Sequence, residues 1–412
     1  YNFKPKRDRA SKILSFLGNI IVNENEEISK KNIQNLHINP TIPKTNINDL
    51  KVDYAKMLKE KGPSNFSKFI KDHKNILITD TTMRDAHQSL IATRMRTDDL
   101  VNIANYYSNH LSELFSIECW GGATFDVSMR FLKEDPWERL QKLNEAAPNL
   151  MKQMLFRGSN AVGYKNYPDN VVKFFVKEAC QAGIDVFRIF DSLNLPENMQ
   201  IAIEEVNKHN KLAEAAICYT NDLTNPNEVK YTLNYYINLV RTFENMGARI
   251  IAIKDMAGLC KPNAIELLIK EIKEVTDLPI HFHTHDTSGT SAASILSAIN
   301  AGVDIVDLAM DSMSGLTSQP AFGSIISAIS SYKNKSEIKE PNIRRASIYW
   351  EEVRKNYRQF ESDFKGGSSD VYQHQMPGGQ FTNLKEQAQS MGIGNDRWEL
   401  VSKTYSDVNK LF

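Results

Sequence analysis

Three histidines occupy alternate positions of one short segment: His281, His283 and His285. Alternate residues of a β-strand point to the same face, so the three imidazoles share one direction if the strand continues that far. Two imidazoles spaced in this way can ligate one metal ion, with nitrogen–metal distances of about 2.0–2.1 Å. The alternative is a polar strand end whose histidines hydrogen-bond to their neighbours, and the triplet alone favours neither interpretation.

Lys254 directly follows an apolar run at 250–253, so we expect its amine to be poorly solvated. Burial disfavours the ammonium ion, and the neutral amine can form a Schiff base with a carbonyl substrate. The amine can also be carbamylated, which would turn the side chain into an oxygen ligand for a metal. An ion pair with Asp255 or Asp191 is the structural alternative.

Asp85 would add a carboxylate oxygen to these candidate ligands from the opposite side of the fold. This hard ligand strengthens the case for a metal and makes carbamylation the favoured use of the lysine. The pattern therefore predicts a divalent metal site, with Asp85 and Lys254 also acting in catalysis. Its predicted ligands are Asp85, Lys254, His283 and His285.

Two arginines, Arg84 and Arg157, follow strands near these residues and suit a substrate carboxylate, which a guanidinium binds through two N–H groups. Arg84 has an obvious internal partner in Glu118, so we expect this pairing to support the catalytic centre. Arg157 is then the predicted carboxylate clamp. Gln88 is predicted to donate its amide to the same substrate.

Three further side chains are predicted to line the substrate pocket: Tyr164, Asp126 and Asp191. Each of them is also compatible with an ordinary structural role. His87 is interpreted as a hydrogen-bonded loop residue, because a single histidine without a partner is seldom a ligand.

Eight short apolar runs with strand character recur along the chain, and we expect them to be the strands that position these residues. The runs are 76–79, 115–118, 153–156, 186–190, 215–219, 250–253, 280–282 and 303–308. Helical patterns separate them, and the clearest places its apolar side chains on one helix face. These side chains are Val229, Leu233, Tyr236, Ile237, Val240 and Phe243. Gly183, Gly247 and Gly302 each end a helix at a position that tolerates a left-handed conformation.

Eight strands alternating with helices over about 250 residues indicate an α/β fold, the (β/α)8 TIM barrel. A doubly wound sheet is the rival, but no glycine-rich phosphate loop follows the first strand. Because TIM barrels carry their chemistry at the carboxyl ends of the strands, the candidate residues should meet at one mouth. We expect three parts: a connecting segment at 1–50, the barrel at 51–335, and the start of a C-terminal helical extension at 336–412.

The composition excludes several classes of function. The chain has 50 Lys+Arg and 50 Asp+Glu, and this zero formal charge argues against nucleic acid as the main partner. No apolar run approaches the roughly 18 residues that a membrane span requires. The four cysteines are widely spaced and indicate reduced, buried thiols of a cytoplasmic protein. They are Cys119, Cys180, Cys218 and Cys260.

Longer motifs resemble a known family. The segments 80–89 (DTTMRDAHQS) and 117–126 (IECWGGATFD) resemble a superfamily of metal-dependent barrels that includes the biotin-dependent carboxyltransferases. Further stretches narrow this resemblance to the carboxyltransferase domains of pyruvate carboxylases, over nearly the whole chain. These stretches are 157–168, 187–194, 253–258, 283–289, 312–320 and 376–380, the last of which is Met-Pro-Gly-Gly-Gln.

The resemblance implies a reaction in which carboxybiotin gives up its carboxyl group, pyruvate loses a methyl proton, and the resulting enolate becomes oxaloacetate. Biotin would arrive on a carrier domain, and ATP would be consumed in a biotin carboxylase domain, both outside this chain. The resemblance further implies that the four predicted ligands hold zinc or manganese, between which the ligand types do not decide. It also implies that Arg157 and Gln88 bind pyruvate. The resemblance also implies a homo-oligomer, which is a tetramer in the whole enzyme.

The chain begins at Tyr1 and ends at Phe412, and we expect both to be cut edges of a longer protein. The family's proton-shuttle threonine would lie just past the last residue. We therefore expect the chain alone to bind metal and pyruvate without completing turnover. Three alternatives stay open: an oxaloacetate decarboxylase or transcarboxylase subunit, a Schiff-base aldolase using Lys254, and a catalytically silent barrel that serves assembly.

Overall fold

The protein is described by a computed structural model that covers residues 13–19, 38–45, 51–361, 364–381, 384, 388, 391–392, 397–409 and 411. The chain divides into two compact units, Tyr1–Asn39 and Pro40–Phe412. In the first unit, 13–19 is helical and overlaps the predicted connecting segment. Most of that segment lies outside the described residues. The second unit holds all the elements discussed below.

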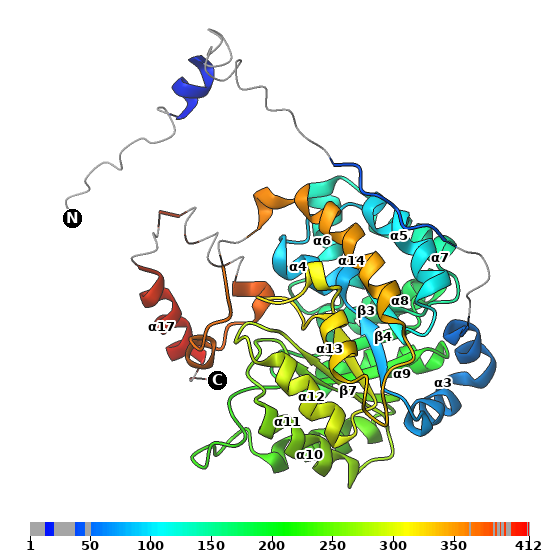
Figure 1. The fold of residues 1–412 in the computed structure, drawn as a ribbon. Coiled ribbons are helices and arrows are strands. Elements are labelled where there is room, and N and C mark those ends of the chain that lie inside the picture. The colour runs from blue at the N-terminus through cyan, green and yellow to red at the C-terminus, as the bar shows by residue number, and fades with distance from the viewer. Residues whose placement is uncertain are drawn as a thin grey trace. The chain divides into compact units, whose positions relative to one another are not determined.

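Eight parallel strands close into a barrel in which each strand pairs with the next and β8 pairs with β1 (Figure 1). The predicted (β/α)8 TIM barrel is therefore confirmed. The strands are β1 (Leu77–Asp80), β2 (Ser116–Gly121), β3 (Lys152–Phe156), β4 (Val186–Phe190), β5 (Leu212–Cys218), β6 (Ile250–Asp255), β7 (Ile280–Thr284) and β8 (Ile305–Leu308).

Helices follow the strands and surround the barrel (Figure 1). The longer ones are α5 (Thr97–His110), α7 (Pro136–Ala146), α8 (Asp169–Gln181), α9 (Glu197–Lys208), α10 (Leu233–Asn245), α11 (Pro262–Lys273), α12 (Ser291–Ala301) and α13 (Phe322–Ala328). Short helical turns lie in the loops: η1 (Thr82–Ala86), α4 (His87–Leu90), α6 (Thr124–Val127), η2 (Ser128–Leu132), η3 (Gly158–Asn160), η4 (Asp311–Met313) and η5 (Arg358–Phe360).

The three glycines that end helices before a strand have the left-handed backbone conformation that the sequence predicts. Gly183, Gly247 and Gly302 have φ values of 104°, 93° and 88°. A side chain with a Cβ atom is strained in this left-handed region, whereas glycine adopts it readily. These residues let the chain turn from the end of one helix into the next strand.

One end of the barrel is closed by α3 (Tyr54–Asp72), which packs its buried aromatic and aliphatic side chains against the first residues of the strands. The helix is kinked at Gly62, where φ is 72° and ψ is 162°, just before Pro63. Proline lacks a backbone N–H and clashes with the preceding helical turn, so the Gly62-Pro63 pair accounts for the kink.

Two details of the predicted elements are wrong. Val229 lies before α10, in a loop, and 90% of its surface is exposed, because the first helical residue is Leu233. Strand β5 begins at Leu212, three residues earlier than predicted, and includes Glu214. A charged residue inside an apolar run masks a strand when its burial partner comes from elsewhere in the sequence.

Beyond the barrel, α14 (Glu340–Lys355) packs on the barrel helices, and α15 (Val371–His374) and α17 (Trp398–Asn409) lie in the extension. The Oγ atom of Ser406 in α17 donates to the carbonyl of Gln373 in α15 at 2.8 Å. All four cysteines are free and buried. Among the described residues, no helix combines the length and the apolar character that crossing a bilayer would require.

Candidate metal and substrate site

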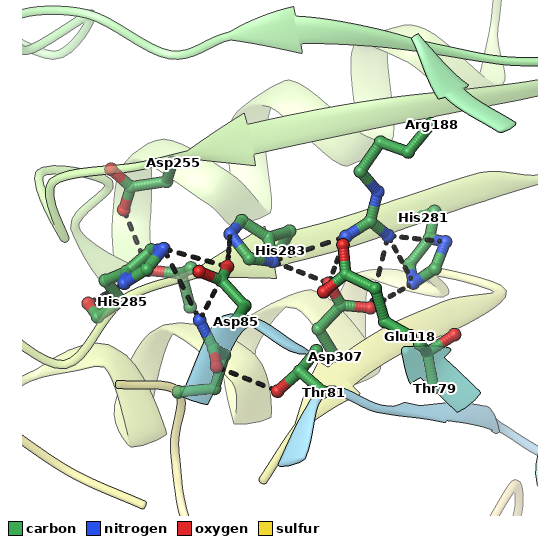
Figure 2. Close-up of polar contacts among 12 residues, drawn as sticks. Thr79, Thr81, Asp85, Glu118, Arg188, Asp255, His281, His283, His285 and Asp307 are labelled. Carbon is green, nitrogen blue, oxygen red and sulfur yellow. Dashed lines mark hydrogen bonds and ion pairs between the residues drawn. The ribbon is translucent and has the colours of Figure 1, made fainter. Parts of the chain in front are cut away.

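The side chains of Asp85, His283 and His285 converge at the carboxyl end of the barrel (Figure 2). Asp85 lies in η1, directly after β1, while His283 belongs to β7 and His285 follows that strand. The Oδ2 atom of Asp85 is 3.3 Å from Nε2 of each histidine. One ligand atom from each of the three buried side chains lies within 4.8 Å of the others. Three donors at this spacing can reach one ion.

Hydrogen bonds fix the tautomers of both histidines. Nδ1 of His283 is 2.5 Å from Oδ2 of Asp307, and Nδ1 of His285 is 2.7 Å from the carbonyl oxygen of Thr317. Since a carboxylate and a carbonyl only accept, we assign the proton of each ring to Nδ1. Both Nε2 atoms then present lone pairs toward Asp85, which is the tautomer that a metal-binding imidazole needs.

Within the described part of the chain, one of these nitrogens has no hydrogen-bond partner. Nε2 of His283 is buried and unsatisfied, which is uncommon for a buried polar atom. Burial and the nearby Lys254 amine lower the pKa of His283 to about 3, so the imidazole is neutral at physiological pH. A neutral, buried and unpartnered nitrogen beside a carboxylate fits a divalent cation.

Lys254 lies next to this group, opposite His283 in the pairing of β6 with β7. It is 4% exposed, and its Nζ is 5.3 Å from the centre of the Phe190 ring. Burial lowers its pKa, although the charge of Asp85 acts in the opposite direction. This environment shifts the amine toward its neutral form, which is the direction that the sequence predicts.

The two carboxylates suggested as structural partners of Lys254 are used elsewhere. Asp255 accepts from the backbone N–H groups of Leu259 and Cys260 at 2.8 and 2.9 Å, and from Oγ1 of Thr284 at 2.8 Å. Asp191 accepts from neighbouring residues of its own loop. In the described part of the chain, no ion pair joins Lys254 to either residue.

Arg84 pairs with Glu118, which confirms the predicted internal partner. Its Nη2 is 2.6 Å from Oε1 of Glu118 and 3.2 Å from Oδ2 of Asp85. Its Nη1 donates to Oε1 of Gln88 at 3.3 Å, and the same oxygen accepts the N–H of Ala123 at 3.2 Å. The carbonyl end of Gln88 is therefore held, and its NH2 group is the end that can donate to a ligand.

Arg157 and Tyr164 lie together at the mouth. The guanidinium carbon of Arg157 is 5.1 Å from the centre of the Tyr164 ring, and its Nη1 donates to the carbonyls of Val162 and Gly163 at 3.0 and 3.3 Å. Burial lowers the pKa of Arg157, and the positive charge of Arg84 adds to that effect. Arg84 and Arg157 thus place two guanidinium groups near each other at the mouth.

Two predicted pocket residues, Asp126 and Asp191, form ion pairs or hydrogen bonds with residues of their own loops. Asp126 is 3.2 Å from Nη2 of Arg130, one helical turn away. The carboxylate of Asp191 accepts the N–H groups of Leu193 and Leu195 at 2.9 and 3.1 Å and the side-chain amide of Asn198 at 2.9 Å. A substrate contact by either residue stays a prediction.

A second cluster of buried charged residues, which the sequence does not predict, surrounds Arg188 below the metal group (Figure 2). Arg188 forms ion pairs with Glu214 and Asp307, and His281 bonds to both carboxylates. His281 therefore does not join His283 and His285 at Asp85. The sequence does contain one indication of this cluster. Arg188, Glu214 and Asp307 are each a charged residue within an otherwise mostly apolar strand.

Gln319 was also not recognised. Its Nε2 donates to Oδ2 of Asp85 at 3.1 Å, and its Oε1 accepts the hydroxyl of Thr81 at 2.8 Å. The amide thus connects the residue after β1 with the loop after β8. Its position in a segment with several polar residues gave no indication of this contact.

A turn of the C-terminal extension, 376–380, completes one wall of the site. The N–H of Gly378 donates to the carbonyl of Met256 at 2.9 Å. A Cβ atom on Gly378 would lie 2.7 Å from the Thr317 carbonyl and 2.9 Å from Nδ1 of His285. Only glycine fits here without displacing the hydrogen bond that orients His285.

Comparisons with known proteins agree with this geometry. Two family models match, HMGL-like over residues 165–348 and Conserved carboxylase domain over residues 371–412. The chain is 48% identical, over its full length, to the pyruvate carboxylase of Bacillus subtilis, and it spans about 36% of that curated relative.

The chain covers a larger share of two solved carboxyl transferase domains than of this full-length relative. The carboxyl transferase domain of Rhizobium etli pyruvate carboxylase with pyruvate has 54% identity and a TM-score of 0.90, covering 98% of this chain and 69% of that chain. The same domain with oxamate and biotin has 55% identity and a TM-score of 0.90, covering 98% of this chain and 68% of that chain.

A closed parallel barrel with polar groups gathered at the carboxyl ends of its strands is the architecture of a (β/α)8 barrel enzyme. The identity and coverage of the solved domains narrow this class. The chain belongs to the family of pyruvate carboxylase carboxyl transferase domains.

Proposed function

We propose that this chain performs the carboxyltransferase half-reaction of a pyruvate carboxylase, in which the carboxyl group of carboxybiotin is moved to pyruvate to form oxaloacetate. The observation that carries the proposal is the convergence of Asp85, His283 and His285 beside the buried amine of Lys254. The family membership and a solved relative that contains pyruvate support the same substrate.

Four side chains would hold a divalent zinc or manganese ion: Asp85, His283, His285 and Lys254, the last as a carbamate. An ion in this position would supply a Lewis acid that stabilises negative charge on the oxygen of an enolate. The lowered pKa of the buried Lys254 amine supports this use, because only an uncharged amine can add carbon dioxide.

The substrate would be held by the cationic mouth. Arg157 would bind the carboxylate of pyruvate through its N–H groups, and Gln88 would donate its NH2 group to the same molecule. Arg84, fixed by Glu118, adds positive charge next to Asp85 without needing to move. Such preorganised donors stabilise the charge that develops when the methyl group of pyruvate loses a proton. Tyr164, Asp126 and Asp191 are the further candidates for lining this pocket.

The other participants would lie outside this chain. Biotin would be supplied by a carrier domain and carboxylated in an ATP-using domain of the same polypeptide, which agrees with the 36% coverage of the curated relative. A homo-oligomer and a reducing, cytoplasm-like compartment complete the proposal, the latter supported by four free cysteines. Within the chain, we propose the divisions 1–50, 51–335 and 336–412 for the connecting segment, the barrel and the extension.

The test is metal and pyruvate binding by the 412-residue chain. We expect about one zinc or manganese per chain by elemental analysis, and pyruvate binding by calorimetry that Arg157→Ala weakens by about 10- to 100-fold, as the loss of a charge-assisted bidentate contact should. Ser159→Ala, in the adjacent loop, is the matched control. A purified chain without stoichiometric metal, or one whose pyruvate affinity ignores Arg157, would contradict the proposal.

A second function is favoured by one observation, the lowered pKa of the buried Lys254 amine, which also suits a Schiff-base aldolase. Borohydride reduction in the presence of pyruvate separates the two functions. A covalent adduct on Lys254 would support the aldolase. A carbamate on Lys254 in the mass spectrum of the intact chain, with bound metal, would support the carboxyltransferase.

A further inference from the structure

Four buried charged side chains form a layer below the candidate metal site. They are Arg188 of β4, Glu214 of β5, His281 of β7 and Asp307 of β8, and each is fully buried. Nδ1 of His281 is 2.7 Å from Oε2 of Glu214, and its Nε2 is 2.6 Å from Oδ1 of Asp307. Arg188 bridges the same two carboxylates.

Asp307 is the member of this layer that reaches the metal site. Its Oδ2 contacts both Nη1 of Arg188 and Nδ1 of His283, while its Oδ1 contacts His281 and, at 3.2 Å, Nη2 of Arg188. Each oxygen is thus held by two partners, and rotation of the carboxylate would break contacts on both sides.

We infer that Asp307 is a positioning residue: it fixes the proton of His283 on Nδ1 and directs the lone pair of Nε2 toward Asp85. The inference rests on the proposed metal site. A neutral imidazole has one proton to place, and a fixed acceptor at Nδ1 decides which nitrogen receives it. Mutation of a carboxylate that hydrogen-bonds to a metal-binding histidine typically lowers metal affinity by about 10- to 100-fold.

A purely structural role for the cluster makes a different prediction. Buried ion pairs are often no more stabilising than apolar residues of similar volume, and removing one partner is destabilising wherever it occurs in the network. Glu214 also pairs with Arg188 and His281 but has no contact with His283. A structural role would therefore make Glu214 and Asp307 equivalent, whereas positioning would make only Asp307 matter for the metal.

The matched pair of variants is Asp307→Asn and Glu214→Gln, each of which exchanges a carboxylate for an amide of nearly equal shape. An Asn amide can turn its NH2 group to Nδ1 of His283, which would move the ring proton to Nε2. We expect Asp307→Asn to lower zinc affinity, measured by competition with a chromogenic chelator, about 10- to 100-fold. Glu214→Gln should change it less than about threefold. Equal losses in the two variants would overturn the inference.

A second measurement keeps the test independent of variant folding and of the metal. The ring nitrogens of 15N-histidine-labelled, metal-free wild-type chain report the tautomer of His283, assigned by the loss of its signals in His283→Gln. We expect the protonated nitrogen to be Nδ1, and protonation at Nε2 would overturn the inference. If the wild-type chain bound neither zinc nor manganese, the proposed metal site would fail, while this tautomer would still decide the role of Asp307.

Discussion

The two ends of the barrel are built on opposite principles. At the end where the strands begin, a cluster of apolar residues packs against Tyr54, Leu58, Phe66 and Ile70 of α3. They are Leu77, Phe115, Met151, Val186, Leu212, Ile250 and Ile305. At the end where the strands finish, buried charged and polar groups face one another instead. Burial of apolar surface stabilises the first end, while the second retains groups whose burial is costly.

This difference shows how one fold separates stability from chemistry. The apolar end needs only shape and volume, so a single kinked helix can close it. The polar end must satisfy every buried charge, and its partners come from β1, β4, β5, β6, β7 and β8. Substitutions at the two ends should therefore fail in different ways.

The largest effect should come from the apolar end. Phe66→Ala removes a fully buried ring that packs against Tyr54 and Phe69, at centroid distances of 6.2 and 5.6 Å. We expect a loss of about 3–5 kcal/mol in the free energy of unfolding, because the closed end leaves little room to collapse. Denaturant titration measures it, and metal affinity should not change. Lys68→Ala, exposed on the same helix, is the control and should be neutral.

At the polar end, His285→Ala should show the reverse pattern. It removes one of the proposed ligands, so we expect metal affinity to fall by more than about 100-fold, with the midpoint of thermal unfolding of the metal-free chain nearly unchanged. Metal titration and calorimetry of the metal-free chain measure the two quantities. His73→Ala, at the opposite end of the barrel, should leave metal affinity intact. A large stability loss in His285→Ala would break the comparison between the ends.

The cost of charge at the polar end should be visible as a pH dependence. Burial raises the pKa of Asp80, the last residue of β1, to about 6. Between the pKa of the unfolded chain, about 4, and this value, the unfolded chain ionises while the folded chain keeps its proton, so stability falls as pH rises. Asp80→Asn should match the wild type below about pH 4 and exceed its free energy of unfolding by roughly 1–3 kcal/mol at pH 7. An equal difference at both pH values would rule this out.

The smallest of the expected effects concerns the turn at Gly378. A methyl group at this position would lie against the Thr317 carbonyl and the His285 ring, so Gly378→Ala should weaken metal binding by about 10-fold by displacing His285. Gly366→Ala is the matched control, because a Cβ atom there meets no atom within 4 Å. Equal metal affinities for the two variants would show that the turn does not constrain His285.

Much of this arrangement is predictable from the sequence, because it depends on local patterns. The spacing of the apolar runs identifies eight strands. The polar residues that follow these strands identify the end of the barrel where the site lies. Asp85, Lys254, His283 and His285 do lie together, and Arg84 pairs with Glu118 as expected. Their functional roles stay proposals, since position alone does not report a ligand.

What the sequence could not give are contacts whose partners are far apart in the chain and whose residue types are common. Arg188 and Glu214 interrupt apolar strands and look like errors in a hydrophobic run until the barrel closes and pairs them. Gln319 is one polar residue among several in its loop, and only three-dimensional closure brings it to Asp85. The position of Asp191 after a strand also does not reveal that its carboxylate accepts N–H groups of its own loop, and a substrate contact by this residue stays a prediction.

The pairing of β1 with β8 has a consequence for the order in which the chain is made. The N–H of Met310 donates to the hydroxyl of Thr82, 228 positions earlier. At about 5–20 residues per second, ribosomal synthesis would leave roughly 10–50 s between these two residues. During that interval the edge of β1 that pairs with β8 is open, and Asp85 lacks His283 and His285 until they have been synthesised. The closed barrel and the arrangement of the candidate metal ligands should therefore form together, in one late step. A partly synthesised chain should not bind a metal ion with this set of ligands.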